Sequence, residues 1–243
     1  MARFFLSADE MRSEQFQLTG DNAAHAKVLR LKAGEQVIAC DGEGHECVCS
    51  VEIVGANQYV LCVNERRDSA TEAPINVSVY MAFPKADKLE HVIQKATELG
   101  AYEIVAFPSA RCVSKPDEKS LKKKLERWQK IAASAAEQSG RGRIPNVIVL
   151  GSFREALERA AKADLPIMFY ENEHATTLRM ALKSTGYKSV SLMSGPEGGL
   201  ETSEVEQAQL AGLQICTLGS RILRCETAPL CGLSAVMYAS GEF

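Results

Sequence analysis

The pattern of apolar and polar residues changes near residue 73. Before that point, apolar and polar positions alternate over short stretches such as Gln36–Cys40 and Cys47–Val54, with glycine-containing turns between them. This alternation predicts a small antiparallel sheet or barrel. After Pro74, short apolar runs alternate with helical patterns, which indicates a parallel sheet covered by helices. We therefore predict an α/β protein with two domains, residues 1–72 and residues 73–243.

Individual elements follow from the same pattern. In the first domain, one helix is predicted between a cap at Asp21 and a stop at Gly34. In the second domain, six apolar runs read as strands buried on both faces: Ile75–Ala82, Tyr102–Phe107, Val147–Leu150, Pro166–Tyr170, Ser189–Ser194 and Leu213–Leu218. The clearest helix has a cap at Asp87 and a stop at Gly100, and another is predicted from about Asp117 to Ser139.

Composition narrows the class of protein. With 46% apolar and 24% charged residues, the chain suits a globular fold. The apolar stretches are too short for a membrane span and the first residues do not resemble a signal peptide, so we expect a cytoplasmic protein with reduced cysteines. His45, Cys47 and Cys49 are the densest group of metal-ligand types, but their alternation favours small buried side chains over zinc. We predict no metal, and we expect His91 and His174 to be structural or surface residues.

The charges are unevenly distributed along the chain. Residues 1–72 hold 7 basic and 12 acidic side chains, whereas residues 111–143 hold 10 basic and 4 acidic ones. A basic segment inside an acidic protein is typical of a site for a polyanion, but a lysine-rich helix is as often a solvated face. The charge pattern alone leaves both interpretations open.

Two polar loops each follow a predicted strand and precede a predicted helix, where ligands bind in parallel α/β sheets. The first, Ser194–Leu200, holds three glycines that let a ligand approach the backbone, and Ser203 with Glu206 forms a capping box for the next helix. An ordinary strand-to-helix turn is the alternative. The loop lacks the spacing of a dinucleotide fingerprint and has no phosphate-binding lysine.

The second loop, Thr217–Pro229, is rich in charge at a helix entrance, where free amides favour anions. It contains Arg221 and Arg224 together with Glu226 and Thr227. The competing interpretation is that Glu226 and Thr227 only cap the helix while the arginines face solvent.

Several separated motifs stand in a fixed order along the chain. They are Ile93–Gly100, Arg127–Ala132 continued by Glu137–Arg141, Gly195–Gly199 and Leu218–Ala228. Together they resemble the RsmE family of 16S ribosomal RNA uracil-N3 methyltransferases, which belongs to the SPOUT superfamily. The segment with His25 and Val28–Arg30 also resembles the small PUA-like barrel of that family. Ser220 stands where proline is common and Cys225 where threonine is expected, so we expect activity to be tuned rather than lost.

The resemblance implies a fold and a set of partners. It implies a PUA-like RNA-binding β-barrel over residues 1–72 and a SPOUT methyltransferase domain over residues 73–243, with a parallel sheet and a deep trefoil knot. It also implies a homodimer, S-adenosylmethionine as cofactor, and 16S ribosomal RNA or the small ribosomal subunit as substrate. By matching positions, the cofactor pocket would be lined by Gly195, Gly198, Gly199, Leu218, Gly219, Ile222, Leu223 and Thr227.

The implied chemistry suggests catalytic groups. Uracil N3 carries a proton that must leave, so a nearby arginine would stabilise the anion and a carboxylate or water would accept the proton. The candidates are Arg111 and Arg224 for the anion, and Glu98, Glu197 and Glu226 as bases or orienting groups. For Glu98, an ion pair with Lys95 or Lys88 is an equally good interpretation.

RNA binding would give the basic segment a role. We expect phosphate contacts from Lys122, Lys123, Arg127, Arg141 and Arg143, and a local patch in the acidic first domain that includes Lys27 and Arg30. Two other functions stay open. The first is a non-catalytic RNA-binding ribosome-assembly factor, and the second is an α/β protein that binds another nucleotide, which the missing phosphate-binding signature disfavours.

Overall fold

The computed structural model describes residues 1–54, 58–114 and 118–243, and within them the chain forms two compact units. Unit 1 consists of Met1–Glu72 together with Ala136–Ile144, and unit 2 consists of Ala73–Ala135 together with Pro145–Phe243. The first unit therefore includes a short late segment that the contiguous division of the sequence assigned to the second domain.

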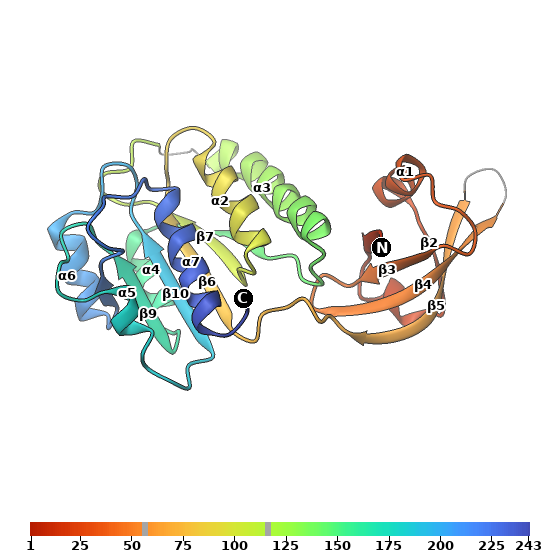
Figure 1. The fold of residues 1–243 in the computed structure, drawn as a ribbon. Coiled ribbons are helices and arrows are strands. Elements are labelled where there is room, and N and C mark those ends of the chain that lie inside the picture. The colour runs from red at the N-terminus through yellow and green to blue at the C-terminus, as the bar shows by residue number, and fades with distance from the viewer. Residues whose placement is uncertain (55–57, 115–117) are drawn as a thin grey trace. The chain divides into compact units, whose positions relative to one another are not determined.

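Unit 1 is built on a five-stranded sheet with the order β1-β3-β4-β5-β2 (Figure 1). Its strands are β1 (Arg3–Phe5), β2 (Gln15–Gln17), β3 (Gln36–Cys40), β4 (His45–Val54) and β5 (Gln58–Asp68), and its helices are η1 (Glu10–Arg12) and α1 (Gly20–Val28). β1 runs parallel to β3, and the other neighbouring strands pair antiparallel. Phe4, Val37 and Leu61 lie in its core. Thr19, not Asp21, precedes α1, and the turn expected after Val54 lies outside the described residues.

Glu72 holds the late segment in unit 1. Its carboxylate accepts hydrogen bonds from Arg141 Nη2 at 2.7 Å and from the amides of Gly142 at 2.9 Å and Arg143 at 3.0 Å. Thr71 Oγ1 also donates to the carbonyl of Gly140 at 2.9 Å. These bonds explain why residues 140–144 belong to unit 1 although they follow a helix of unit 2.

Unit 2 is built on a six-stranded parallel sheet with the order β11-β9-β10-β6-β7-β8. The strands are β6 (Asn76–Ala82), β7 (Glu103–Phe107), β8 (Asn146–Val149), β9 (Leu165–Phe169), β10 (Ser189–Ser194) and β11 (Gln214–Cys216). All six predicted strands are confirmed. Side chains such as Val79, Ile104 and Leu192 are fully buried, as expected for strands that are covered on both faces of the sheet.

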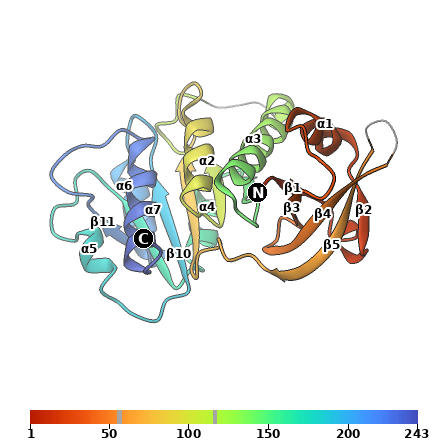
Figure 2. The same cartoon turned by 45° about the vertical axis from the view of Figure 1, so that its right-hand side comes forward.

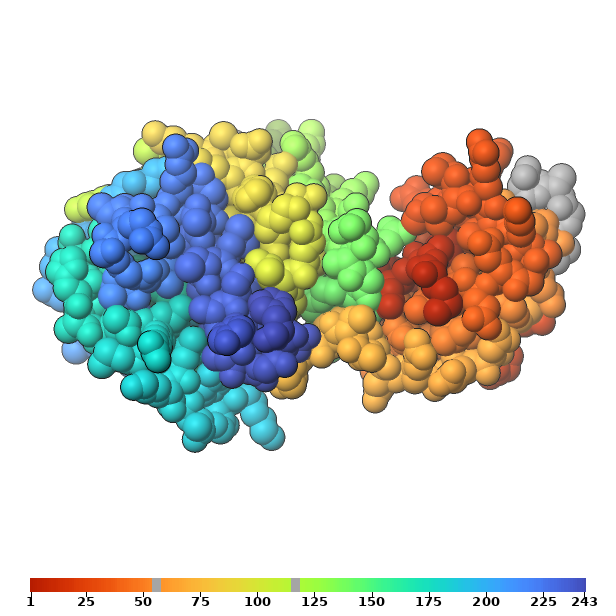
Figure 3. Space-filling view, in the orientation of Figure 1, coloured from red at the N-terminus to blue at the C-terminus, as the bar shows by residue number. Residues whose placement is uncertain are grey.

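Helices cover both faces of this sheet (Figure 2). They are α2 (Lys88–Glu98), α3 (Glu118–Ser139), α4 (Phe153–Ala160), α5 (Leu178–Ala181), α6 (Thr202–Leu210) and α7 (Thr227–Ala239). α7 packs on β6, β10 and α2, and Figure 3 shows its dark blue residues beside the yellow residues of α2. α4 packs on β6, β7 and β10 from the opposite face. In the described part of the chain, no helix is both long and apolar enough to cross a membrane.

Three details of the sequence prediction concern helix boundaries, and the structure corrects two of them. Asp87 precedes α2 as expected, but its side chain makes no capping hydrogen bond. The start expected at Asp117 lies outside the described residues, which resume with Glu118. The capping box of α6 is formed by Glu201 and Glu204, not by Ser203 and Glu206, since Glu204 Oε2 accepts from the Glu201 amide at 2.9 Å.

Candidate functional site

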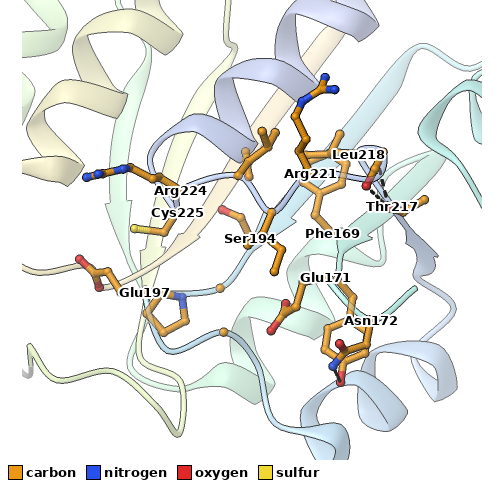
Figure 4. A pocket seen from close by; sticks show the side chains of 18 of the residues that line it. Phe169, Glu171, Asn172, Ser194, Glu197, Thr217, Leu218, Arg221, Arg224 and Cys225 are labelled. Atoms are coloured by element: carbon orange, nitrogen blue, oxygen red, sulfur yellow. Dashed lines mark hydrogen bonds between the residues drawn. The ribbon is translucent and has the colours of Figure 1, made fainter. Parts of the chain in front are cut away.

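A cavity of about 650 Å³ opens at the carboxyl ends of β9, β10 and β11 (Figure 4). It is lined by residues 169–172 and 174 at the end of β9 and just after it, by residues 194–199 at the end of β10, by the loop between β11 and α7, and by Lys88 at the start of α2. Carboxyl ends of parallel strands are where α/β sheets bind ligands. The cavity therefore unites both loops that the sequence singled out and adds a third loop after β9.

The loop after β10 is close to its neighbours at each glycine. A Cβ at Gly195 would lie 2.9 Å from Leu200 Cγ, and one at Gly198 would lie 3.1 Å from Arg111 Cβ. Gly199 has φ of +69°, and a Cβ there would lie 2.3 Å from Glu171 Oε1. A side chain at any of these three glycines would force a neighbour to shift, and its absence leaves the backbone there accessible to a ligand.

Two side chains fix the loop after β7 to the loop after β10. Arg111 Nη1 donates to the carbonyl of Gly198 at 3.1 Å. Glu204, which is buried, accepts from the Ala110 amide at 2.8 Å while it also holds the start of α6. These contacts tie the glycine loop to the rest of unit 2.

The loop between β11 and α7 is fixed at its beginning. The Thr217 amide donates to the carbonyl of Thr176 at 2.8 Å, and Thr217 Oγ1 accepts from the Gly219 amide at 3.2 Å. Farther along, Arg221 and Arg224 are exposed, and in the view of Figure 4 their side chains leave the loop in different directions. The loop therefore presents two exposed cationic groups from a fixed base.

Lys88 connects the two loops at one end of the cavity. Its Nζ lies 3.0 Å from Glu197 Oε1 and 3.2 Å from Glu226 Oε2. Burial raises the pKa of each carboxylate, but hydrogen bonds from backbone amides and from Lys88 outweigh burial and hold both pKa values below the ordinary range. Both groups are therefore ionised at neutral pH. Burial and the bond to Glu226 raise the pKa of the Cys225 thiol to about 12, so it stays protonated.

The comparisons with known proteins agree along nearly the whole chain. A family model for an RNA methyltransferase domain matches residues 71–237, and one for an RNA methyltransferase PUA domain matches residues 18–61. Ribosomal RNA small subunit methyltransferase E of Bacillus subtilis (strain 168) is 40% identical over 98% of this chain and 96% of that protein. The chain belongs to this methyltransferase family.

Solved structures extend the likeness to the fold. Ribosomal RNA small subunit methyltransferase E from Neisseria gonorrhoeae, bound to S-adenosyl methionine, is 30% identical with a TM-score of 0.86, and the match covers 98% of this chain and 97% of that one. A methyltransferase from Legionella pneumophila in complex with the same cofactor is 28% identical with a TM-score of 0.83, over 98% and 97% of the two chains. The predicted family and the α/β fold with its curled amino-terminal sheet are confirmed.

The resemblance to the RsmE family assigned eight residues to the cofactor, and most of them line the cavity. They are Gly195, Gly198, Gly199, Leu218, Gly219, Ile222 and Leu223. Thr227 is the first residue of α7 and is not among the residues that line the cavity. Their roles stay predictions.

The catalytic candidates separate into three groups. Arg224 and Glu197 line the cavity, and Glu226 joins them through Lys88. Arg111 is an anchor of the glycine loop outside the described lining. The structure does not bring Glu98 to the cavity, because its carboxylate pairs with Lys95 Nζ at 2.8 Å on the same helix. Of the two interpretations of Glu98, the structure favours the helical ion pair.

Several cavity residues escaped the sequence analysis. The end of β9 contributes Phe169, and the loop after it contributes Glu171, Asn172 and His174, an exposed histidine for which no cavity position was expected. The available signal was position, since these residues follow a predicted strand as the other two loops do. Lys88 also lines the cavity, but its position at a helix start gave no such signal.

The residues proposed for RNA phosphates have different surroundings. Lys122 and Lys123 are exposed on α3, and Lys27 and Arg30 are exposed at the end of α1. Arg127 pairs with Glu90 at 2.6 Å, and Arg143 donates to the carbonyl of Glu43. Arg141 requires a correction. Only 4% of it is exposed and its guanidinium pairs with Glu72, so it holds unit 1 together and does not face solvent.

Proposed function

We propose that this protein transfers a methyl group from S-adenosylmethionine to N3 of a uridine in 16S ribosomal RNA. The observation that carries the proposal is the cavity at the ends of β9, β10 and β11, whose walls hold the motifs Gly195–Gly199 and Leu218–Leu223. A catalytic role is better supported than the assembly-factor alternative, because a chain that had lost the reaction would have no need to keep these loops intact.

The residues present fit the cofactor. A volume of about 650 Å³ accommodates a ligand of nucleoside size. The glycine loop offers backbone groups, and Leu218 and Leu223 offer apolar surface to a planar base. The carboxylate of Glu171 lies in the cavity and accepts no hydrogen bond from the described residues, so it is available to a hydroxyl or ammonium donor. When bound, the cofactor supplies an electrophilic methyl group.

The protein's own groups then prepare the uracil. Arg224, exposed at the cavity, would stabilise the negative charge that develops on the carbonyl oxygens as N3 loses its proton. Glu197 and Glu226 are poor acceptors for that proton, because their pKa values are lowered. We infer that water accepts the proton, and that both carboxylates have an orienting role.

The proposal extends to the whole chain. Residues 1–72 would bind RNA and residues 73–243 would carry catalysis, with phosphate contacts from exposed cations such as Lys122 and Lys123 on α3. The protein would act in the cytoplasm as a homodimer, without a membrane partner. The trefoil knot implied by the family stays a prediction.

One assay tests the proposed reaction. The purified protein is incubated with tritiated S-adenosylmethionine and small ribosomal subunits from cells that lack the enzyme, and the RNA is digested to nucleosides. We expect label in N3-methyluridine. Label in another nucleoside would contradict the substrate, and cofactor binding without any label would favour the assembly-factor function.

A further inference from the structure

Lys88 joins three elements that are far apart in the sequence. It is the first residue of α2, yet its ammonium group lies between Glu197, in the loop after β10, and Glu226, directly before α7. The two N···O distances, 3.0 Å and 3.2 Å, are those of direct ion pairs. One side chain thus spans both loops that supply the matched motifs.

The turn before α2 also holds the Glu197 carboxylate, through a backbone amide. The Lys85 amide donates to Glu197 Oε1 at 3.0 Å, the oxygen that also accepts from Lys88. Between these two residues, Ala86 has φ of +56°, a conformation that costs energy for any residue with a side chain. Such strain persists where the surrounding contacts determine the backbone. The turn is therefore shaped to bring an amide and an ammonium group to one carboxylate.

Lys88, Glu197 and Glu226 form a charged cluster that is partly shielded from water, so the balance of charge within it affects its stability. The side chains of Lys88 and Glu197 are each 27% exposed, and that of Glu226 is 19% exposed. The Cys225 thiol donates to Glu226 Oε2 at 3.2 Å, so its proton is committed to the same carboxylate. Without the ammonium group, two half-buried carboxylates would face each other without a cation between them.

We propose that Lys88 is a positioning residue for methyl transfer: by bridging Glu197 and Glu226, it fixes the glycine loop to the start of α7 and shapes the cavity before the cofactor binds. This inference rests on the proposed function. Lys88 acts through the two carboxylates and, together with backbone amides, lowers their pKa values. In a protein that lacks Lys88, binding of the cofactor should therefore depend on pH in a way that loss of a purely structural lysine would not produce.

Calorimetric titration with S-adenosylmethionine from pH 5 to pH 8 tests the bridge. We expect Lys88→Met to weaken binding about tenfold at pH 7.5, the scale of one partly exposed charged contact. Since Lys88 contributes to the lowered pKa of both carboxylates, its removal should raise these pKa values, and binding should weaken further toward the acid end of this range. Wild-type affinity should stay flat over this range. Lys88→Arg keeps the charge and should stay within about threefold of wild type with a flat profile.

Lys95→Met is the matched control. It removes an ammonium group from the same helix and breaks a comparable ion pair, with Glu98 at 2.8 Å, outside the cavity. We expect it to bind the cofactor as the wild type does. Thermal unfolding of each variant measures whether the protein is still folded, which separates a loss of affinity from a loss of folding.

Each outcome decides between the two proposals. If the wild type binds the cofactor and Lys88→Met binds it equally well, the inference is overturned and the proposed function stands. The same conclusion follows if Lys88→Met and Lys88→Arg lose equal affinity. A wild-type protein that does not bind the cofactor would overturn both. If Lys88→Met does not fold, Glu197→Gln and Glu226→Gln replace it, and full affinity in both would overturn the bridge.

Discussion

Gly199 and Glu171 approach each other so closely that a side chain at position 199 would displace the Glu171 carboxylate. A Cβ at Gly199 would lie 2.3 Å from Glu171 Oε1, closer than such atoms approach in proteins. Glu171 follows β9 and Gly199 follows β10, and these strands are neighbours in the sheet. The close approach brings an available carboxylate and an accessible stretch of backbone to the same wall of the cavity.

Gly199→Ala should therefore damage cofactor binding more than stability. The new methyl group displaces the Glu171 carboxylate, and φ of +69° strains any residue with a side chain. We expect roughly tenfold weaker binding by calorimetry and a stability loss of about 1 kcal/mol. Gly186→Ala is the control, because Gly186 has φ of +88° with nothing within 4 Å of the added Cβ. It should lose similar stability but bind normally, and normal binding by Gly199→Ala would contradict the prediction.

Gly232 permits α7 to pack on the ring of Phe169, which lines the cavity. A Cβ at Gly232 would lie 2.4 Å from Phe169 Cζ. Alanine improves helix propensity by about 1 kcal/mol, but the clash in a packed core costs more. We expect Gly232→Ala to lower the free energy of unfolding by about 1–3 kcal/mol in denaturant titrations.

A second substitution checks the cause of that loss. Phe169→Leu removes the ring atoms that the new methyl group would strike, so the double variant should be more stable than the sum of the two single losses predicts. Additive losses would show that the helix and the ring do not conflict.

The sequence predicted the parts of the molecule that follow from local pattern. The six strands of unit 2 were visible because residues such as Val79 and Leu192 are buried on both faces, which produces continuous apolar runs. The two glycine-containing loops were visible because ligand loops follow parallel strands and because unusual backbone conformations select glycine.

The missed parts depend on contacts across long sequence separations. Glu171 follows a predicted strand, but its residue type gave no signal, and it reaches the site only because the strand order places β9 beside β10. Lys88 meets Glu226 only through the packing of α2 on α7. Arg141 was assigned to RNA from its charge, but Glu72, distant in sequence, turns it inward. Charge patterns do not indicate which cations are already paired within the fold.

Asp41 and His45 make the stability of unit 1 depend on pH. His45 Nδ1 lies 2.6 Å from Asp41 Oδ2, and this hydrogen bond raises the pKa of His45 above its ordinary value of 6.5. The stability that it provides is present below the unfolded pKa and is lost as pH rises through the folded one. Burial raises the pKa of Asp41, but hydrogen bonds from the amides of Glu43 and His45 and from the His45 ring lower it overall. That contribution is lost as pH falls through the lowered pKa.

The two effects together favour a window between about pH 4 and pH 6.5. We expect the melting temperature of wild type to exceed that of His45→Gln by the largest margin near pH 5.5, and the margin to close as pH rises through the raised pKa of His45. Thermal unfolding of both proteins across this range measures the margin. A margin that does not change with pH would show that protonation of His45 is not linked to folding.

Lys122 and Lys123 offer a direct test of RNA binding by α3, because both are exposed and the structure pairs neither with a described carboxylate. If both contact phosphates, replacing them with glutamine should weaken binding to 16S ribosomal RNA and reduce the slope of log affinity against log salt by about 1 to 2. Lys162→Gln with Lys183→Gln removes the same charge from exposed positions outside the basic segment. Equal losses in the two double variants would show that only net charge matters. A loss confined to Lys122 and Lys123, with cofactor affinity unchanged, would separate RNA docking on α3 from the chemistry in the cavity.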